Sequence, residues 1–110
     1  MDVSVARARV TNLLKQAEGI IESLEAKDAG GRWAMTAFSR YRACQLLGVS
    51  PYEPYDGGLD ADPAELLDQA AVEVDQLDVS IDDLSWRLAV ADALRSAAAD
   101  IRMVQDARDV

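Results

Sequence analysis

Residues 62–91 read DPAELLDQAAVEVDQLDVSIDDLSWRLAVA, and this run decides the fold that we expect. Asp62 is a favoured N-cap residue, Pro63 takes the first helical position, and Glu65 follows where a capping box places an acid. The next apolar residues recur at spacings of three and four, as on the buried face of an amphipathic helix. These residues are Leu67, Ala70, Val74 and Leu77. We therefore predict that a helix begins at Asp62.

The end of this helix has two interpretations. The apolar spacing continues through Ile81, Leu84, Leu88 and Ala91, which favours one long helix. Ser80, followed three residues later by Asp83, favours instead a break near Val79 and a new helix start. Both interpretations stay open at this point.

The last helix, expected to end at about residues 103–107, carries a second apolar line. Its members are Trp86, Val90, Ala93, Ala97, Ile101 and Val104. Two apolar faces indicate burial on two sides. Either this helix is the central member of the bundle, or one face is reserved for another chain.

Two further helices are predicted in the first half of the chain. One runs from about Asp2 to Lys27, with Lys15, Glu18, Glu22 and Glu25 on its outward face, and Gly30-Gly31 ends it. The other runs from about Arg32 to Leu47. Its buried stripe contains Trp33, Ala37, Tyr41, Cys44 and Leu47, with Met35 and Phe38 beside it.

The predicted fold class is an all-α single domain, covering residues 1–110, in which three to four helices form a bundle. Pro51, Pro54, Gly57 and Gly58 break any helix between residues 48 and 61, so this segment is expected to be one long loop. Nineteen alanines and few aromatic residues are typical of closely packed helices.

The charge of the chain is polarised along the sequence. No lysine or arginine occurs from Ala43 to Trp86, although this segment contains eleven aspartates and glutamates. Residues 1–49 carry a net charge of +2 and residues 50–110 one of −11, which gives the −9 of the whole chain. Such a field bears on partners and on association rates more than on the fold.

Composition also argues against several kinds of chemistry. The chain has no histidine, and its one cysteine, Cys44, lies on the buried stripe, so we predict no catalytic residue and no enzyme activity. Residues 56–62 supply acids but not the order of an EF-hand loop, and neither a metal nor a cofactor is expected. The basic residues of the first half barely exceed its acids, which disfavours direct nucleic-acid binding.

Location and origin are inferred from composition alone. No apolar run approaches the length of a membrane span, no leader is evident, and a lone cysteine fits a reducing compartment, so a cytoplasmic protein is expected. Nine arginines against two lysines suggest a high-GC genome, such as that of an actinobacterium or one of its phages.

The leading functional prediction is a noncatalytic protein-interaction module whose acidic helical face, about residues 53–83, docks on a basic protein surface. It could act as an inhibitor that imitates phosphate charge; acidic helical immunity proteins that block nucleases are similar in size and charge. The predicted partner-binding residues are Asp56, Asp60, Asp68, Asp75, Asp78, Asp82, Asp83, Tyr52, Tyr55 and Trp86. The two tyrosines either anchor the partner or fold back over the bundle, and Trp86 either packs internally or meets the partner.

The alternative prediction is a self-assembling structural or assembly-factor subunit, for example of a phage particle or another bacterial complex. It rests on the two-faced last helix, whose alanines would allow helices of neighbouring copies to approach closely. A homo-oligomer is the state that this alternative requires.

Overall fold

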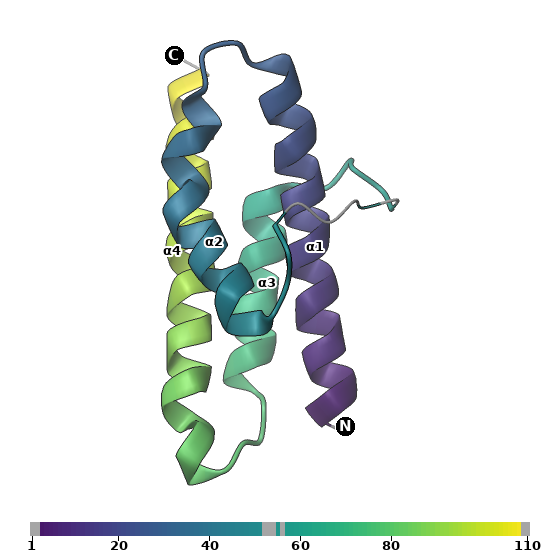
Figure 1. The fold of residues 1–110 in the computed structure, drawn as a ribbon, viewed down its shortest axis with the longest axis vertical. Helices are drawn as coiled ribbons and strands as arrows, with labels where there is room; N and C mark the ends of the chain where they lie inside the picture. Colours follow the sequence, from purple (N-terminus) through teal and green to yellow (C-terminus); the bar gives the residue numbers. More distant parts are fainter. Residues whose placement is uncertain (1–2, 52–54, 56, 109–110) are drawn as a thin grey trace.

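Four α-helices carry the fold in the computed structural model, which describes residues 3–51, 55 and 57–108 (Figure 1). They are α1 (Val3–Lys27), α2 (Ala37–Leu47), α3 (Pro63–Asp75) and α4 (Leu84–Arg108). Two short 3-10 helices, η1 (Arg32–Thr36) and η2 (Ile81–Asp83), precede α2 and α4. The prediction of an all-α bundle is confirmed.

The two central helices are α3 and α4, which run antiparallel and pack along most of the length of α3 (Figure 1). The helix α1 lies on the outer side of α3, and α2 lies against α4. Because α4 packs on both α3 and α2, most of its two apolar lines is covered by the chain itself, although Leu88 is exposed. Of the two interpretations of this helix, the central position is the one found.

The boundary between α3 and α4 lies where the second interpretation put it. The helix α3 ends at Asp75, and Ser80 is extended, with φ −66° and ψ 163°. The Ser80 hydroxyl donates a hydrogen bond to Oδ2 of Asp83 at 3.1 Å, and the Asp83 N–H donates to the Ser80 carbonyl at 3.0 Å. A single continuous helix is therefore wrong. Once the chain turns, the apolar registers of α3 and α4 are independent, and Ile81 and Leu88 are exposed.

The start of α3 agrees with its sequence signal. Oδ1 of Asp62 accepts a hydrogen bond from the Ala64 N–H at 3.0 Å, and Pro63 occupies the first turn. The amide of Gln105 donates to the same Asp62 oxygen at 3.0 Å, which ties the last turns of α4 to the first turn of α3. The predicted N-cap is confirmed.

The segment predicted as one helix over residues 32–47 is in fact two elements. Residues 32–36 form η1, and α2 follows directly at Ala37. Gly31 (φ 67°) and Gly48 (φ 70°) take left-handed conformations at the two ends of this segment, where glycine is favoured. Because a 3-10 helix has about 3.0 residues per turn rather than about 3.6, η1 rotates its side chains out of the expected register.

This rotation and the tertiary packing overturn four assignments. Tyr41, expected on the buried stripe, and Met35 and Phe38, expected beside it, are exposed, whereas Trp33, Cys44 and Leu47 are buried as predicted. On α1, Glu18 was expected on the outward face and is buried, where it pairs with a buried Arg40 of α2.

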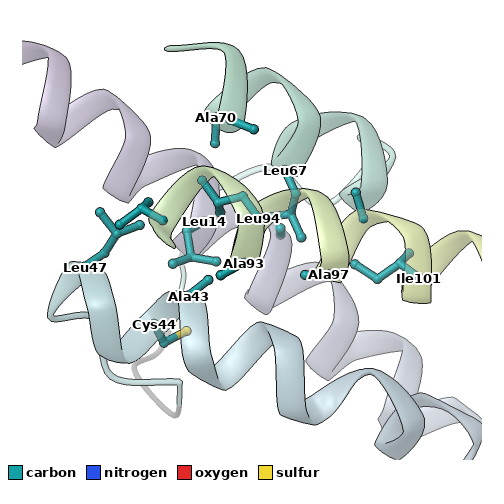
Figure 2. Packing of buried hydrophobic residues seen from close by; sticks show 14 of the residues in the cluster. Leu14, Ala43, Cys44, Leu47, Leu67, Ala70, Ala93, Leu94, Ala97 and Ile101 are labelled. Carbon is teal, nitrogen blue, oxygen red and sulfur yellow. The ribbon is translucent and has the colours of Figure 1, made fainter. Parts of the chain in front are cut away.

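The core takes residues from all four helices and is rich in small side chains (Figure 2). Ala43 and Cys44 of α2 approach Ala93 and Leu94 of α4, and Leu67 of α3 packs beside them. Small residues on facing helices let the backbones approach closely, so leucines and isoleucines between them fill the remaining space.

Candidate functional site

The predicted partner-binding residues lie in separate parts of the structure. Tyr52 and Asp56 lie outside the described residues. The other eight are Asp68 and Asp75 of α3, three acids in the turn between α3 and α4, Asp60 just before α3, and two aromatic residues that pack against helices.

Three acids of α3 are paired with arginines. Asp68 pairs with Arg102 of α4 at 2.6 Å, and Asp75 pairs with Arg95 of α4. These hydrogen bonds raise the pKa of both arginines. On the α1 side, Glu73 pairs with Arg9 at 2.6 Å. Much of the charge that the sequence assigns to this face is therefore compensated within the chain.

The acids of residues 78–83 are not matched in this way. Asp78, Asp82 and Asp83 are all exposed, and no described lysine or arginine forms an ion pair with them. Ile81, in the middle of this segment, is 85% exposed. We name residues 78–83 the acidic turn; it forms one end of the bundle (Figure 1).

Asp60 lies at the other end of α3. It is exposed and stands two residues before Asp62, the N-cap of α3. The 13 residues of α3 separate this end from the acidic turn, a helix length of about 20 Å. The two acidic segments therefore cannot act as one compact patch.

Tyr55 lies against α1. An ideal Cβ built at Gly19 would lie 2.9 Å from the Tyr55 Cβ and 3.2 Å from its Cδ1, so a glycine is needed where the ring side chain crosses the helix. This close approach gives a physical reason for a helical glycine, which is otherwise disfavoured by about 1 kcal/mol. The half-buried Tyr55 folds back onto the bundle.

Trp86 is half-buried near the start of α4 and joins three helices. Its Nε1 donates a hydrogen bond to the Leu46 carbonyl at the end of α2, at 2.9 Å. The guanidinium of Arg7 on α1 lies 4.7 Å from the ring centroid, within the range of a cation–π contact. The position of Trp86 in the structure is thus explained by internal packing.

Sequence reasoning missed an exposed apolar surface on α2 and α4. Phe38 is 84% exposed, Met35 74% and Met103 68%. An adjacent groove of about 240 Å³ is lined by Arg32, Met35, Asp100, Met103, Val104 and Ala107. We call the surface formed by these exposed residues, by Arg32 and Asp100 of the groove, and by Arg42, Asp92 and Ala99 the α2–α4 face. The sequence gives no separate signal for it, because Met35 and Phe38 also fit a buried stripe.

Two buried ionisable groups, Glu18 and Cys44, have raised pKa values. Burial raises the pKa of the Glu18 carboxyl, and this effect outweighs the lowering effect of Arg40. Burial, together with the negative charge of Glu18, raises the pKa of the Cys44 thiol to about 12. A thiol of this kind is a poor nucleophile at neutral pH.

The described residues do not group the ligands that a metal ion requires: nowhere do three or more aspartate, glutamate or cysteine side chains converge suitably. Within the same residues, none of the helices is long and apolar enough to cross a bilayer.

The fold and these surfaces define an all-α four-helix bundle with an acidic end and an exposed apolar face. No family model, curated protein or solved structure matches the chain.

Proposed function

We propose that this chain is a noncatalytic protein-binding module that docks its acidic turn on a basic surface of a protein partner. The observation that carries the proposal is the contrast within one set of acids. Asp68, Glu73 and Asp75 of α3 are paired with arginines, whereas Asp78, Asp82 and Asp83 are exposed at one end and form no ion pair with a described lysine or arginine.

The exposed Ile81 adds an apolar contact at the centre of the acidic turn. Interfaces combine an apolar centre with a charged rim, and charge complementarity speeds encounter and rejects partners of like charge. A partner whose basic surface surrounds a small apolar depression fits this arrangement. Proteins that hold phosphates with arginines and lysines offer such surfaces, and blocking one of them is the inhibitory form of this function.

Asp82 and Asp83 have a competing structural role. They stand in the first turn of η2, where negative charge interacts favourably with the helix dipole. Asp78 lies between the two helices, and this role does not account for it.

The test is affinity capture from cells of the source organism with three baits. The first is the native chain, the second carries Asp78→Asn, Asp82→Asn and Asp83→Asn, and the third carries Asp68→Asn, Glu73→Gln and Asp75→Asn. The two variants change the net charge equally, but the third bait loses only acids that already have arginine partners.

We expect a basic protein to be captured by the native and third baits and lost with the second, and to elute with modest salt. Thermal unfolding of all three baits checks that each is folded. Equal capture by the second and third baits, or capture that salt does not weaken, refutes docking through the acidic turn.

A further inference from the structure

The charges of α4 are sorted between its two packed sides. Three of its arginines turn toward α3: Arg95 and Arg102 pair with Asp75 and Asp68, and Arg87 donates to the Leu77 carbonyl at 2.9 Å. Two of its aspartates turn toward α2. Asp92 pairs with Arg42 at 3.1 Å, and Asp100 accepts a hydrogen bond from the Ser39 hydroxyl at 2.7 Å.

The segment of η1 and α2 has the opposite composition. Residues 32–47 contain three arginines and no acid. The α2–α4 face therefore presents a basic row, with Arg32 and Arg42, beside an acidic row, with Asp92 and Asp100, and the exposed Met35, Phe38 and Met103 accompany them.

On α4, a line of exposed residues runs along one face of the helix, and Asp92 of the acidic row belongs to this line. Leu88, Asp92, Ala99, Met103 and Asp106 are all exposed. At about 100° per residue, they fall within roughly 60° of one another around the helix axis. The face is thus long, it carries several exposed apolar side chains, and its charges nearly cancel, with Arg32 and Arg42 against Asp92, Asp100 and Asp106, on a chain whose net charge is −9.

We infer that the α2–α4 face binds the same face of a second copy of this chain. Two copies that each carry −9 repel one another over most of their surface, so association costs least through a face whose charges nearly cancel. This face meets that condition, and it also carries Phe38, the most exposed large apolar side chain of α2.

The charges on the face also favour one of the two possible symmetries of the dimer. In a two-fold dimer joined face to face, the axis lies in the interface and runs either along the helices or across them. If the axis runs across the helices, α4 of one copy packs on α4 of the other, and the aspartates of the two copies face one another. An axis along the helices sets α2 on α4 of the other copy. Arg42 then faces Asp92 of the second copy, because the two residues lie at the same height within one chain.

The same operation places apolar residues opposite one another. Met35 and Met103 line one groove and so lie at one height, and the axis along the helices brings Met35 over Met103 of the second copy. The face covers about 28 Å of α4 and two helices of width, roughly 500 Å² per copy. This is below the roughly 800 Å² of a standard interface, so we expect a dimer that dissociates on dilution.

The first test is sedimentation of the full chain over a range from low to several hundred micromolar. The native protein is expected to shift from one mass toward twice that mass. Phe38→Asp is expected to remain monomeric, whereas Val72→Asp, at an exposed valine of α3, is the matched control and should associate like the native chain. A native chain that stays monomeric throughout, or a Phe38→Asp variant that associates normally, overturns the inference.

The second test uses charge reversal across the proposed axis. Arg42→Asp alone and Asp92→Arg alone each set like charges against one another in a homodimer, and each should weaken association at least about tenfold. Mixed together, the two variants should recover association, because residue 42 of each copy then faces an opposite charge at residue 92 of the other. Failure of the mixture to recover rules out this arrangement.

This dimer does not depend on the acidic turn. The variant carrying Asp78→Asn, Asp82→Asn and Asp83→Asn should dimerise at least as strongly as the native chain, because each copy loses three negative charges outside the interface, so the two proposals can fail separately. If the α2–α4 face is instead needed to capture a different protein while the purified chain remains monomeric, the inference of a second copy is wrong.

Discussion

Nη1 of Arg40 donates a hydrogen bond to Oε2 of Glu18 at 2.7 Å, and both side chains are buried between α1 and α2. The same guanidinium donates to the Thr36 hydroxyl at 2.7 Å and to Oε1 of Glu25 at 3.0 Å. Direct packing between α1 and α2 is sparse compared with the α1–α3 and α3–α4 contacts. The hydrogen bonds and ion pairs of Arg40 are therefore the main interactions that join α1 to α2.

Arg40→Met is expected to destabilise the fold by about 3–5 kcal/mol, because it leaves the buried Glu18 carboxylate without its cation. Arg42→Met is the matched control: it removes an arginine of the same helix whose partner Asp92 is exposed, and should cost no more than about 1 kcal/mol. Urea denaturation of both variants at neutral pH measures the difference. Similar losses for the two variants would contradict the burial argument.

The stability of the native chain relative to Glu18→Gln should depend on pH. Burial raises the folded-state pKa of Glu18 above its ordinary value of 4.5. The contribution of the carboxyl to stability is therefore fully present below pH 4.5, and it is lost as pH rises through the higher folded-state pKa. Parallel urea titrations over this range give the free-energy difference. A difference that grows in favour of the native chain as pH rises would show that pairing with Arg40 outweighs burial.

Cys44 should resist thiol reagents while the chain is folded. Its pKa of about 12 leaves roughly one thiolate in ten thousand at about pH 8, and the side chain is buried. An aromatic disulfide reagent is expected to react slowly in buffer and rapidly in unfolding concentrations of urea. Rapid labelling of the folded chain at the rate of a free thiol would place Cys44 in an exposed environment.

Gly19→Ala tests the approach of Tyr55 to α1. In the native background the added Cβ meets the Tyr55 Cβ at 2.9 Å, and the expected crowding cancels or exceeds the roughly 1 kcal/mol of helix propensity that alanine brings. In a Tyr55→Gly background the same substitution should stabilise the chain by up to about 1 kcal/mol. A double-mutant cycle by urea denaturation gives the coupling. Equal effects of Gly19→Ala in both backgrounds would exclude this contact.

The start of α3 shows how far local sequence signals reach. Asp62 and Pro63 define a helix start through bonds to their near neighbours, and the glycines and prolines after Leu47 exclude a helix whatever the rest of the chain does. The all-α class and the ends of α1 and α2 follow from such signals. The register of η1 could not be predicted from such signals, because a 3-10 turn and an α-helical turn have similar sequence preferences.

The candidate sites depended on contacts that sequence spacing does not reveal. Arg9 meets Glu73 across 64 residues, Ser39 meets Asp100 across 61, and Arg40 meets Glu18 across 22. These contacts decide which acids are neutralised, which ion pair is buried, and why the acids of residues 78–83 remain exposed.

The amino-acid sequence by itself determined that this chain forms helices, where most of them begin and end, and that its second half is strongly acidic. Each of these properties depends on residues within a few turns of one another, or on composition alone. Only the tertiary structure decided that Arg40 is interior, that Phe38 is exposed, and that the charges of α4 are sorted between its two neighbours. The physical reason is that burial and pairing depend on which helices lie side by side, and that choice is made by the packing of the whole core.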